Sequence, residues 1–175
     1  MSSRPTTSQL IFYGVTEFLT KKMEVHNSKM GCAQNPKTAF SGTLPVALTP
    51  KRYIKGLVKS FETSPGVAVV MLIYVERLLE RMESQYREAG GLDPILFTSF
   101  NAHRIILTCF LVAQKYCEDR NYKLASIARA GGIEKTELIF LENEFLDFVD
   151  FDLFIKEDVF NNYVESAIVF SKHLC

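Results

Sequence analysis

The chain has 175 residues, which is enough for one domain with a single substantial core. Its 47% of hydrophobic residues excludes a disordered chain, and 20 basic against 20 acidic residues disfavour nucleic acid and anionic membranes as partners, because both attract net positive charge. The sequence shows no CxxC spacing, secretory signal or prenylation ending, so we expect an intracellular protein of the nucleus or cytoplasm.

The N-terminal part contains one predicted helix between two irregular segments. Residues 1–9 are small and polar, and we expect them to form a flexible N-terminus. Apolar side chains recur at threes and fours within residues 10–26, which predicts a leading helix capped by Thr7 or Ser8. Glycines and prolines interrupt residues 27–49, so this segment is predicted to be an extended linker.

Two helix starts are marked by a hydroxyl residue followed by proline. Thr49–Pro50 supplies an N-cap and a first helical residue, and the apolar stripe that follows ends near Phe61. Ser64–Pro65 repeats the signal, and the second helix is expected to run to about Arg87, before a stop at Gly90–Gly91.

A central helix is predicted over Asn101 to Asp119, with Thr98 or Ser99 as its cap. Every residue from Ile105 to Ala113 except Thr108 is apolar, as in a helix surrounded by others, and the run is too short for a membrane span. One strip of this helix is expected to face a partner, and it contains Arg104, Thr108, Leu111, Lys115 and Glu118 or Asp119. Another is expected to face neighbouring helices, and it contains Ile105, Ile106, Cys109, Ala113 and Tyr116.

Three further helices complete the prediction. The first is closed by Gly131–Gly132, where left-handed backbone angles cost least. The helices are expected at about 124–130, 134–149 and 156–170. The fold class is therefore all-α, with a helical core at 50–155 and a C-terminal helix within 156–175.

Two residues of the helix at 134–149 stand on unexpected faces. Glu142 falls on the apolar face, where a carboxylate is costly unless it is paired. Either its head reaches solvent at the edge of the stripe, or it meets Lys115 on the central helix. Phe140 falls on the outward face; we expect the leading or C-terminal helix to cover it, and the alternative is an exposed docking residue.

The residue pattern does not favour an enzyme. His103 and Cys117 lie on one helix, roughly 21 Å apart along its axis, which is too far for a nucleophile and its base. No histidines show metal-ligand spacing, and no GxxxxGK[ST] loop surrounds Gly131–Gly132. We expect no catalytic residue, cofactor or metal site.

Several motifs together resemble a known family. They are YVERLL at 74–79, NAHRIILTCFLVAQK at 101–115 and AGGIEKTELIFLENEFLDFVDFDL at 130–153, with FSGTLPVAL at 40–48 before them. In these residues the chain resembles the cyclin box, and within that family the P/U-type cyclins, a group that includes regulators of phosphate-responsive kinases. The combination of NxHR with GGIxxxEL is far more specific than a generic helical pattern.

The resemblance implies a single five-helix cyclin box at 50–155, with an N-terminal helix and one additional C-terminal helix. It implies a non-catalytic regulatory subunit of cell-cycle or phosphate signalling that forms a heterodimer with a cyclin-dependent protein kinase. Such a subunit binds through its third and fifth helices and pushes the kinase's catalytic-glutamate helix inward. Lys115 and Glu142 match the lysine and glutamate that characterise the family. The neighbouring contact positions correspond to Tyr116, Leu146, Phe151 and Leu153.

The chain departs from the family at Gly56, where relatives often carry a basic residue that pairs with an acidic one on the next helix. Glu76 is that acidic residue here, and Arg52, Lys55 or Arg104 are its candidate partners.

A rival function keeps the fold and changes the partner, because cyclin folds also occur in transcription factors that bind DNA or protein. A DNA-binding module needs clustered cations to neutralise phosphates. The only dense basic spots here are short, at Lys21–Lys22 and Lys51–Arg52, so no nucleic-acid partner and no membrane are expected.

Overall fold

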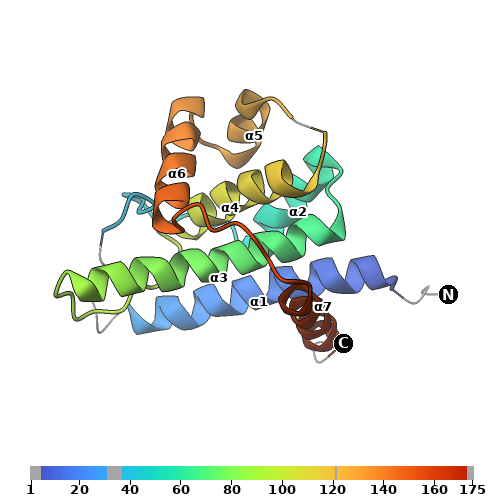
Figure 1. Cartoon of the computed structure of the whole chain (residues 1–175), viewed down its shortest axis with the longest axis horizontal. Helices are drawn as coiled ribbons and strands as arrows, with labels where there is room; N and C mark the ends of the chain where they lie inside the picture. Colours follow the sequence, from blue (N-terminus) through green and yellow to red (C-terminus); the bar gives the residue numbers. More distant parts are fainter. Residues whose placement is uncertain (1–4, 31–36, 121, 173–175) are drawn as a thin grey trace.

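The computed structural model describes residues 5–30, 37–120 and 122–172, and these ranges contain seven helices and no strand (Figure 1). The prediction of an all-α fold is confirmed. The helices are α1 (Thr7–Lys29), α2 (Pro50–Phe61), α3 (Pro65–Glu88), α4 (Ala102–Cys117), α5 (Leu124–Gly131), α6 (Lys135–Phe148) and α7 (Glu157–Lys172).

The two starts predicted from hydroxyl–proline pairs are confirmed. The Thr49 side chain accepts a hydrogen bond from the amide of Arg52, and Ser64 accepts one from the amide of Val67. In each helix proline occupies the first turn, where a backbone N–H would have no partner within the helix, so its absence costs no hydrogen bond.

The leading helix begins earlier than predicted. Thr6 is its N-cap, and Thr6 and Gln9 form a reciprocal capping box, so Thr7–Gln9 are helical although they were assigned to the flexible segment 1–9. Residues 1–4 of that segment lie outside the described residues. At its other end α1 extends to Lys29, which shortens the predicted linker, and residues 31–36 of that linker are likewise not described.

The central helix is shorter than predicted and has a different cap. It begins after Asn101, whose side-chain oxygen accepts from the amide of Thr98 at 2.8 Å while its amide group donates to the carbonyl of Leu96, also at 2.8 Å. Thr98 and Ser99 therefore do not cap it. It ends at Cys117, because Glu118 has an extended backbone.

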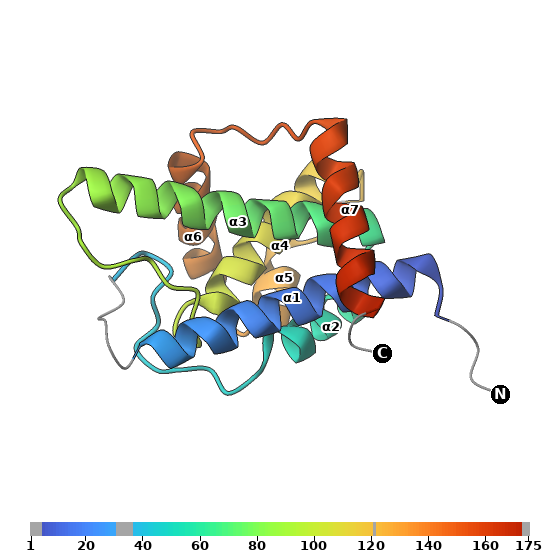
Figure 2. The same ribbon diagram turned by 90° about the horizontal axis from the view of Figure 1, so that it is seen from below.

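The core is built around α4, in which every residue from Ala102 to Gln114 except Arg104 is buried. Figures 1 and 2 show α3 beside α4, with α1 packed along α3 on the side away from α6. The last helix, α7, crosses α1 and α3 and closes that side of the core (Figure 2). The outer face of α6 is left uncovered by either terminal helix.

Glu76 on α3 takes its partners from the two terminal helices. One carboxylate oxygen accepts from the Lys22 ammonium of α1 at 2.8 Å, and the other accepts from the Tyr163 hydroxyl of α7 at 2.8 Å. The predicted partners Arg52, Lys55 and Arg104 were wrong, because the cation that lies beside Glu76 is Lys22 of α1.

Candidate partner-binding site

Lys115 and Glu142 form an ion pair that joins α4 to α6. The lysine Nζ lies 2.6 Å from the glutamate Oε1, which confirms the predicted meeting of the two side chains. The Glu142 side chain is 14% exposed, whereas that of Lys115 is 49% exposed. Lys115 also lies in the last turn of α4, where a cation is favoured by the helix dipole. The pair therefore places a fixed positive and a fixed negative head at the edge of a buried surface.

The rest of the polar strip predicted on α4 does not form a surface. Thr108 and Leu111 are buried, and the Thr108 hydroxyl donates to the carbonyl of Arg104 at 2.8 Å. Arg104, at the other end of the helix, pairs with Glu137 of α6 at 2.6 Å. The neighbouring helices cover the middle of α4 on all sides, so α4 reaches solvent only at its C-terminal end and, in part, at Arg104.

Tyr116 was predicted to face neighbouring helices, and it does so only in part. It is 48% exposed, and its ring packs edge-on against Tyr74 of α3 with the centroids 6.3 Å apart. The helix ends one residue later, and α3 covers only one side of this position. Tyr116 therefore lies next to Lys115 on the accessible end of α4.

The segment after α6 turns sharply and is tied to α3. Asp150 and Phe151 have left-handed backbone angles, with φ values of 52° and 54°, and the Phe151 amide donates to the carbonyl of Leu146 at 3.0 Å. These angles are unusual for residues with a side chain, and the bond to Leu146 holds the turn. The Phe151 ring is consequently directed outward and is 66% exposed.

Two side chains of α3 hold the residues beyond this turn. The Tyr74 hydroxyl donates to the carbonyl of Leu153 at 2.9 Å, and the Arg77 guanidinium donates to the carbonyls of Asp152 and Phe154. Since the backbone of this segment is fixed, the exposed ring of Phe154 is presented in a defined place. Leu153 itself is half-buried against the core.

The structure adds two apolar residues that the sequence reasoning missed. Ile139 is 39% exposed and lies one turn before Glu142, in line with Glu142 and the half-buried Leu146. Phe154 follows the matched segment and is 67% exposed. The i, i+3, i+7 spacing of residues 139, 142 and 146 could have indicated Ile139 from the sequence. Nothing in the sequence pattern indicated Phe154.

Phe140 is 52% exposed, so the expectation that a terminal helix covers it was wrong. The physical reason is the packing of α1 and α7 against α3, on the side opposite α6 (Figure 1). The exposed alternative is the one observed, although Phe140 projects from a different side of α6 than Ile139 and Glu142.

Two titratable groups at opposite ends of α4 have shifted pKa values. Burial and the nearby Glu118 raise the pKa of the Cys117 thiol, which disfavours the thiolate. Burial lowers the pKa of His103, at the far end of the same helix. No group of three His, Cys, Asp or Glu side chains that could hold a metal ion occurs among the described residues. None of their helices is long and apolar enough to cross a membrane.

Comparisons with known proteins give a consistent family. The cyclin family model matches residues 15–153. Cyclin-P4-1 of Oryza sativa subsp. japonica is 35% identical over 126 residues, or 72% of this chain and 55% of the relative. Cyclin-U4-1 of Arabidopsis thaliana is 32% identical over 126 residues, which are 72% of this chain and 57% of the relative. Cyclin-U4-3 of Arabidopsis thaliana is 28% identical over 147 residues, which are 83% of this chain and 62% of the relative. The chain thus spans little more than half the length of these relatives.

Proposed function

Because the chain belongs to the cyclin family, we propose that it is a non-catalytic regulatory subunit that binds and activates a cyclin-dependent Ser/Thr protein kinase. The observation that carries the proposal is the Lys115–Glu142 pair at the accessible end of α4. The place of action is where the kinase is, in the nucleus or cytoplasm, and the process served is the cell cycle or phosphate signalling.

The polar part of the surface binds main-chain groups of the kinase. A lysine ammonium has three donors, and the bond to Glu142 uses one of them. The carboxylate keeps acceptor capacity for a partner N–H. Because each head holds the other in place, little side-chain entropy is lost when the kinase segment binds.

The apolar part of the surface supplies most of the binding free energy. Tyr116 is 48% exposed and Phe151 is 66% exposed, and burial of aromatic rings dominates many interfaces. Leu146 and Leu153 continue the surface inward, while Ile139 and Phe154 extend it. The arrangement suits a partner helix with an apolar face and main-chain groups that are free near its end.

Activation follows from a difference in affinity. If this surface fits the kinase conformer whose catalytic-glutamate helix is turned inward, binding shifts the population toward that conformer. The size of the shift is set by the ratio of the affinities for the two conformers. A shift from 1:99 to 99:1 requires roughly 10⁴-fold tighter binding to the active conformer. Phosphoryl transfer itself stays with the kinase, where the glutamate pairs with and aligns the lysine that holds the ATP phosphates.

The test is addition of the purified chain to a panel of monomeric cyclin-dependent kinases, with binding and peptide phosphorylation measured together. The proposal expects at least one kinase to bind saturably and to gain activity in the same concentration range. Binding to none of the kinases, combined with tight and steeply salt-dependent binding to duplex DNA, would favour the DNA-binding alternative.

A further inference from the structure

A second surface lies between the leading helix and the first helix of the cyclin box. It is a groove of about 350 Å³ that we call the α1–α2 groove. Its walls are mainly apolar and come from Phe12 and Tyr13 of α1 and from Ile54 and Val58 of α2. Lys51 and Lys55 stand at its rim. None of these residues belongs to α4, α6 or the segment after α6, so the groove is separate from the proposed kinase surface.

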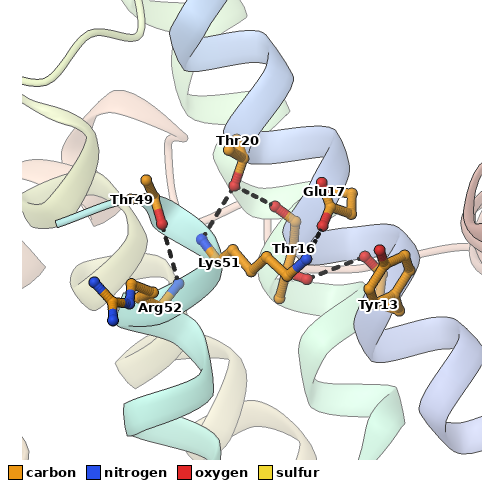
Figure 3. Close-up of polar contacts among 7 residues, drawn as sticks. All are labelled: Tyr13, Thr16, Glu17, Thr20, Thr49, Lys51 and Arg52. Carbon is orange, nitrogen blue, oxygen red and sulfur yellow. Dashed lines mark hydrogen bonds and ion pairs between the residues drawn. The ribbon is translucent and has the colours of Figure 1, made fainter. Parts of the chain in front are cut away.

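Polar contacts join the two helices, and some of them involve residues that line the groove (Figure 3). The Lys51 ammonium reaches across to Glu17 and lies 4.5 Å from the centre of the Tyr13 ring. The Thr20 hydroxyl accepts from the Lys51 amide at 3.1 Å and donates to the carbonyl of Thr16 at 2.8 Å. Because these bonds fix the spacing of α1 and α2, the groove exists before any ligand binds, which lowers the cost of occupying it.

The exposed side of α2 carries an excess of positive charge. The basic residues of α2 are Lys51, Arg52, Lys55 and Lys59, and the helix has no acidic residue. Glu17 compensates Lys51, whereas Arg52, Lys55 and Lys59 are exposed and form no ion pair with any other described residue. Arg52 points away from α1 in Figure 3. Lys55 is therefore the unpaired cation that lines the groove, and Lys59 lies one helical turn further along α2. The chain as a whole is neutral, which makes this cluster a local field.

We infer that the α1–α2 groove binds an acidic segment of a partner protein whose bulky apolar side chains enter the groove while its carboxylates face Lys55 and Lys59. Apolar walls with a cationic rim are complementary to an amphipathic acidic peptide. Nucleic acid fits less well, because its phosphates gain nothing from the aromatic and aliphatic walls and require more cations than this rim provides. The inference is independent of whether the other surface binds a kinase.

The test uses a fluorescein-labelled synthetic peptide of Glu, Leu and Phe, roughly three helical turns long, with the apolar residues on one face. Fluorescence anisotropy with the whole chain is expected to show saturable binding. Lys55→Glu combined with Lys59→Glu should weaken it by about tenfold, and Phe12→Ala by about fivefold. The matched control is Lys123→Glu with Lys135→Glu, which makes the same change of net charge at exposed lysines of other elements and should leave binding within about twofold. Circular dichroism checks that each variant is folded.

Three other outcomes would overturn the inference. Equal binding of the peptide to wild type and both groove variants would place it elsewhere, and a lack of saturable binding would remove the site. Equally tight binding of duplex DNA or anionic vesicles, lost on charge reversal but kept by Phe12→Ala, would make this a surface for polyanions instead. Kinase binding measured on the Lys55→Glu, Lys59→Glu variant should equal wild type, which separates failure here from failure of the kinase proposal.

Discussion

Gly14 of α1 packs directly on the backbone of Ala167 of α7. A Cβ atom at residue 14 would overlap the carbonyl group of Ala167, so only glycine allows the two helices to approach this closely. This contact lets α7 cover the buried side chains of α1, and it joins the two elements that flank the five-helix core. The terminal helices are thus part of the domain's packing.

Gly14→Ala should destabilise the chain by about 1–3 kcal/mol, because the added methyl group forces α1 and α7 apart. Gly56→Ala is the matched control, since that glycine lies in α2 with open space around it. Alanine there should raise the free energy of unfolding by about 0.5–1 kcal/mol through helix propensity. Urea unfolding followed by circular dichroism measures both; an equal gain in the two variants would mean that the α1–α7 contact is not tight.

The Lys22–Glu76–Tyr163 contacts should contribute measurably to stability, because the Lys22 and Glu76 side chains are only 24% and 23% exposed. Glu76→Gln should lower the free energy of unfolding by about 1–2 kcal/mol, and Tyr163→Phe by about 0.5–1.5 kcal/mol. A double-mutant cycle of Lys22→Met with Glu76→Gln isolates the pair. Additive losses would show that lysine and glutamate do not interact.

Stability should fall on mild acidification because of His26. Its Nδ1 accepts from the Phe97 amide at 2.8 Å, so the neutral ring is the one that fits. Burial, followed by the nearby Lys22 and Lys29, lowers the pKa of His26, against a smaller opposing effect of Glu83. The unfolded chain then binds more protons below about pH 6.5, so unfolding becomes easier as the pH falls from there toward the folded-state pKa.

The measurement is urea unfolding of wild type and His26→Gln at about pH 7.5 and pH 5.5, a range that avoids most carboxylate titration. Wild type should lose more stability than the variant, because glutamine keeps a hydrogen-bond acceptor without titrating. An identical loss in both proteins would assign the pH dependence to other groups.

The two aromatic residues Phe140 and Phe145 of α6 should respond oppositely to truncation. Phe145 is fully buried, and Phe145→Ala should cost about 3–5 kcal/mol. Phe140 is 52% exposed, and Phe140→Ala should change stability by less than about 0.5 kcal/mol. Thermal unfolding of the two variants provides the comparison. A large loss at Phe140 would mean that another part of the protein covers it.

The features predicted correctly from the sequence were those with a local or strongly penalised signal. The starts of α2 and α3 follow from a cap and a proline that are adjacent in the chain. The meeting of Lys115 with Glu142 followed from the cost of a carboxylate on an apolar face. Such signals do not depend on knowing the rest of the fold.

The errors concerned residues whose exposure or pairing depends on which distant segment of the chain packs beside them. Periodicity placed Tyr116 against neighbouring helices, but it cannot show that α4 ends beside this residue and leaves about half of its side chain exposed. Phe140 is exposed and Glu76 pairs with Lys22 for one common reason, which is that α1 and α7 pack on α3. The side of the core on which the terminal helices pack is determined by tertiary contacts, and the spacing of apolar residues within either helix does not reveal it.

The two ion pairs between α4 and α6 provide a matched comparison for the proposed interface. Lys115–Glu142 and Arg104–Glu137 both have a distance of 2.6 Å and join the same helices, at opposite ends of α4. Loss of either pair should affect stability to a similar, small degree. Only the first belongs to the proposed kinase surface.

The most direct test is therefore the dissociation constant for a cyclin-dependent kinase that the wild-type chain binds, compared with those of Lys115→Ala and Arg104→Ala. We predict that Lys115→Ala weakens binding about tenfold or more, whereas Arg104→Ala stays within about twofold. Equal affinities for wild type and Lys115→Ala, or an equal loss in the two variants, would contradict the assigned kinase surface.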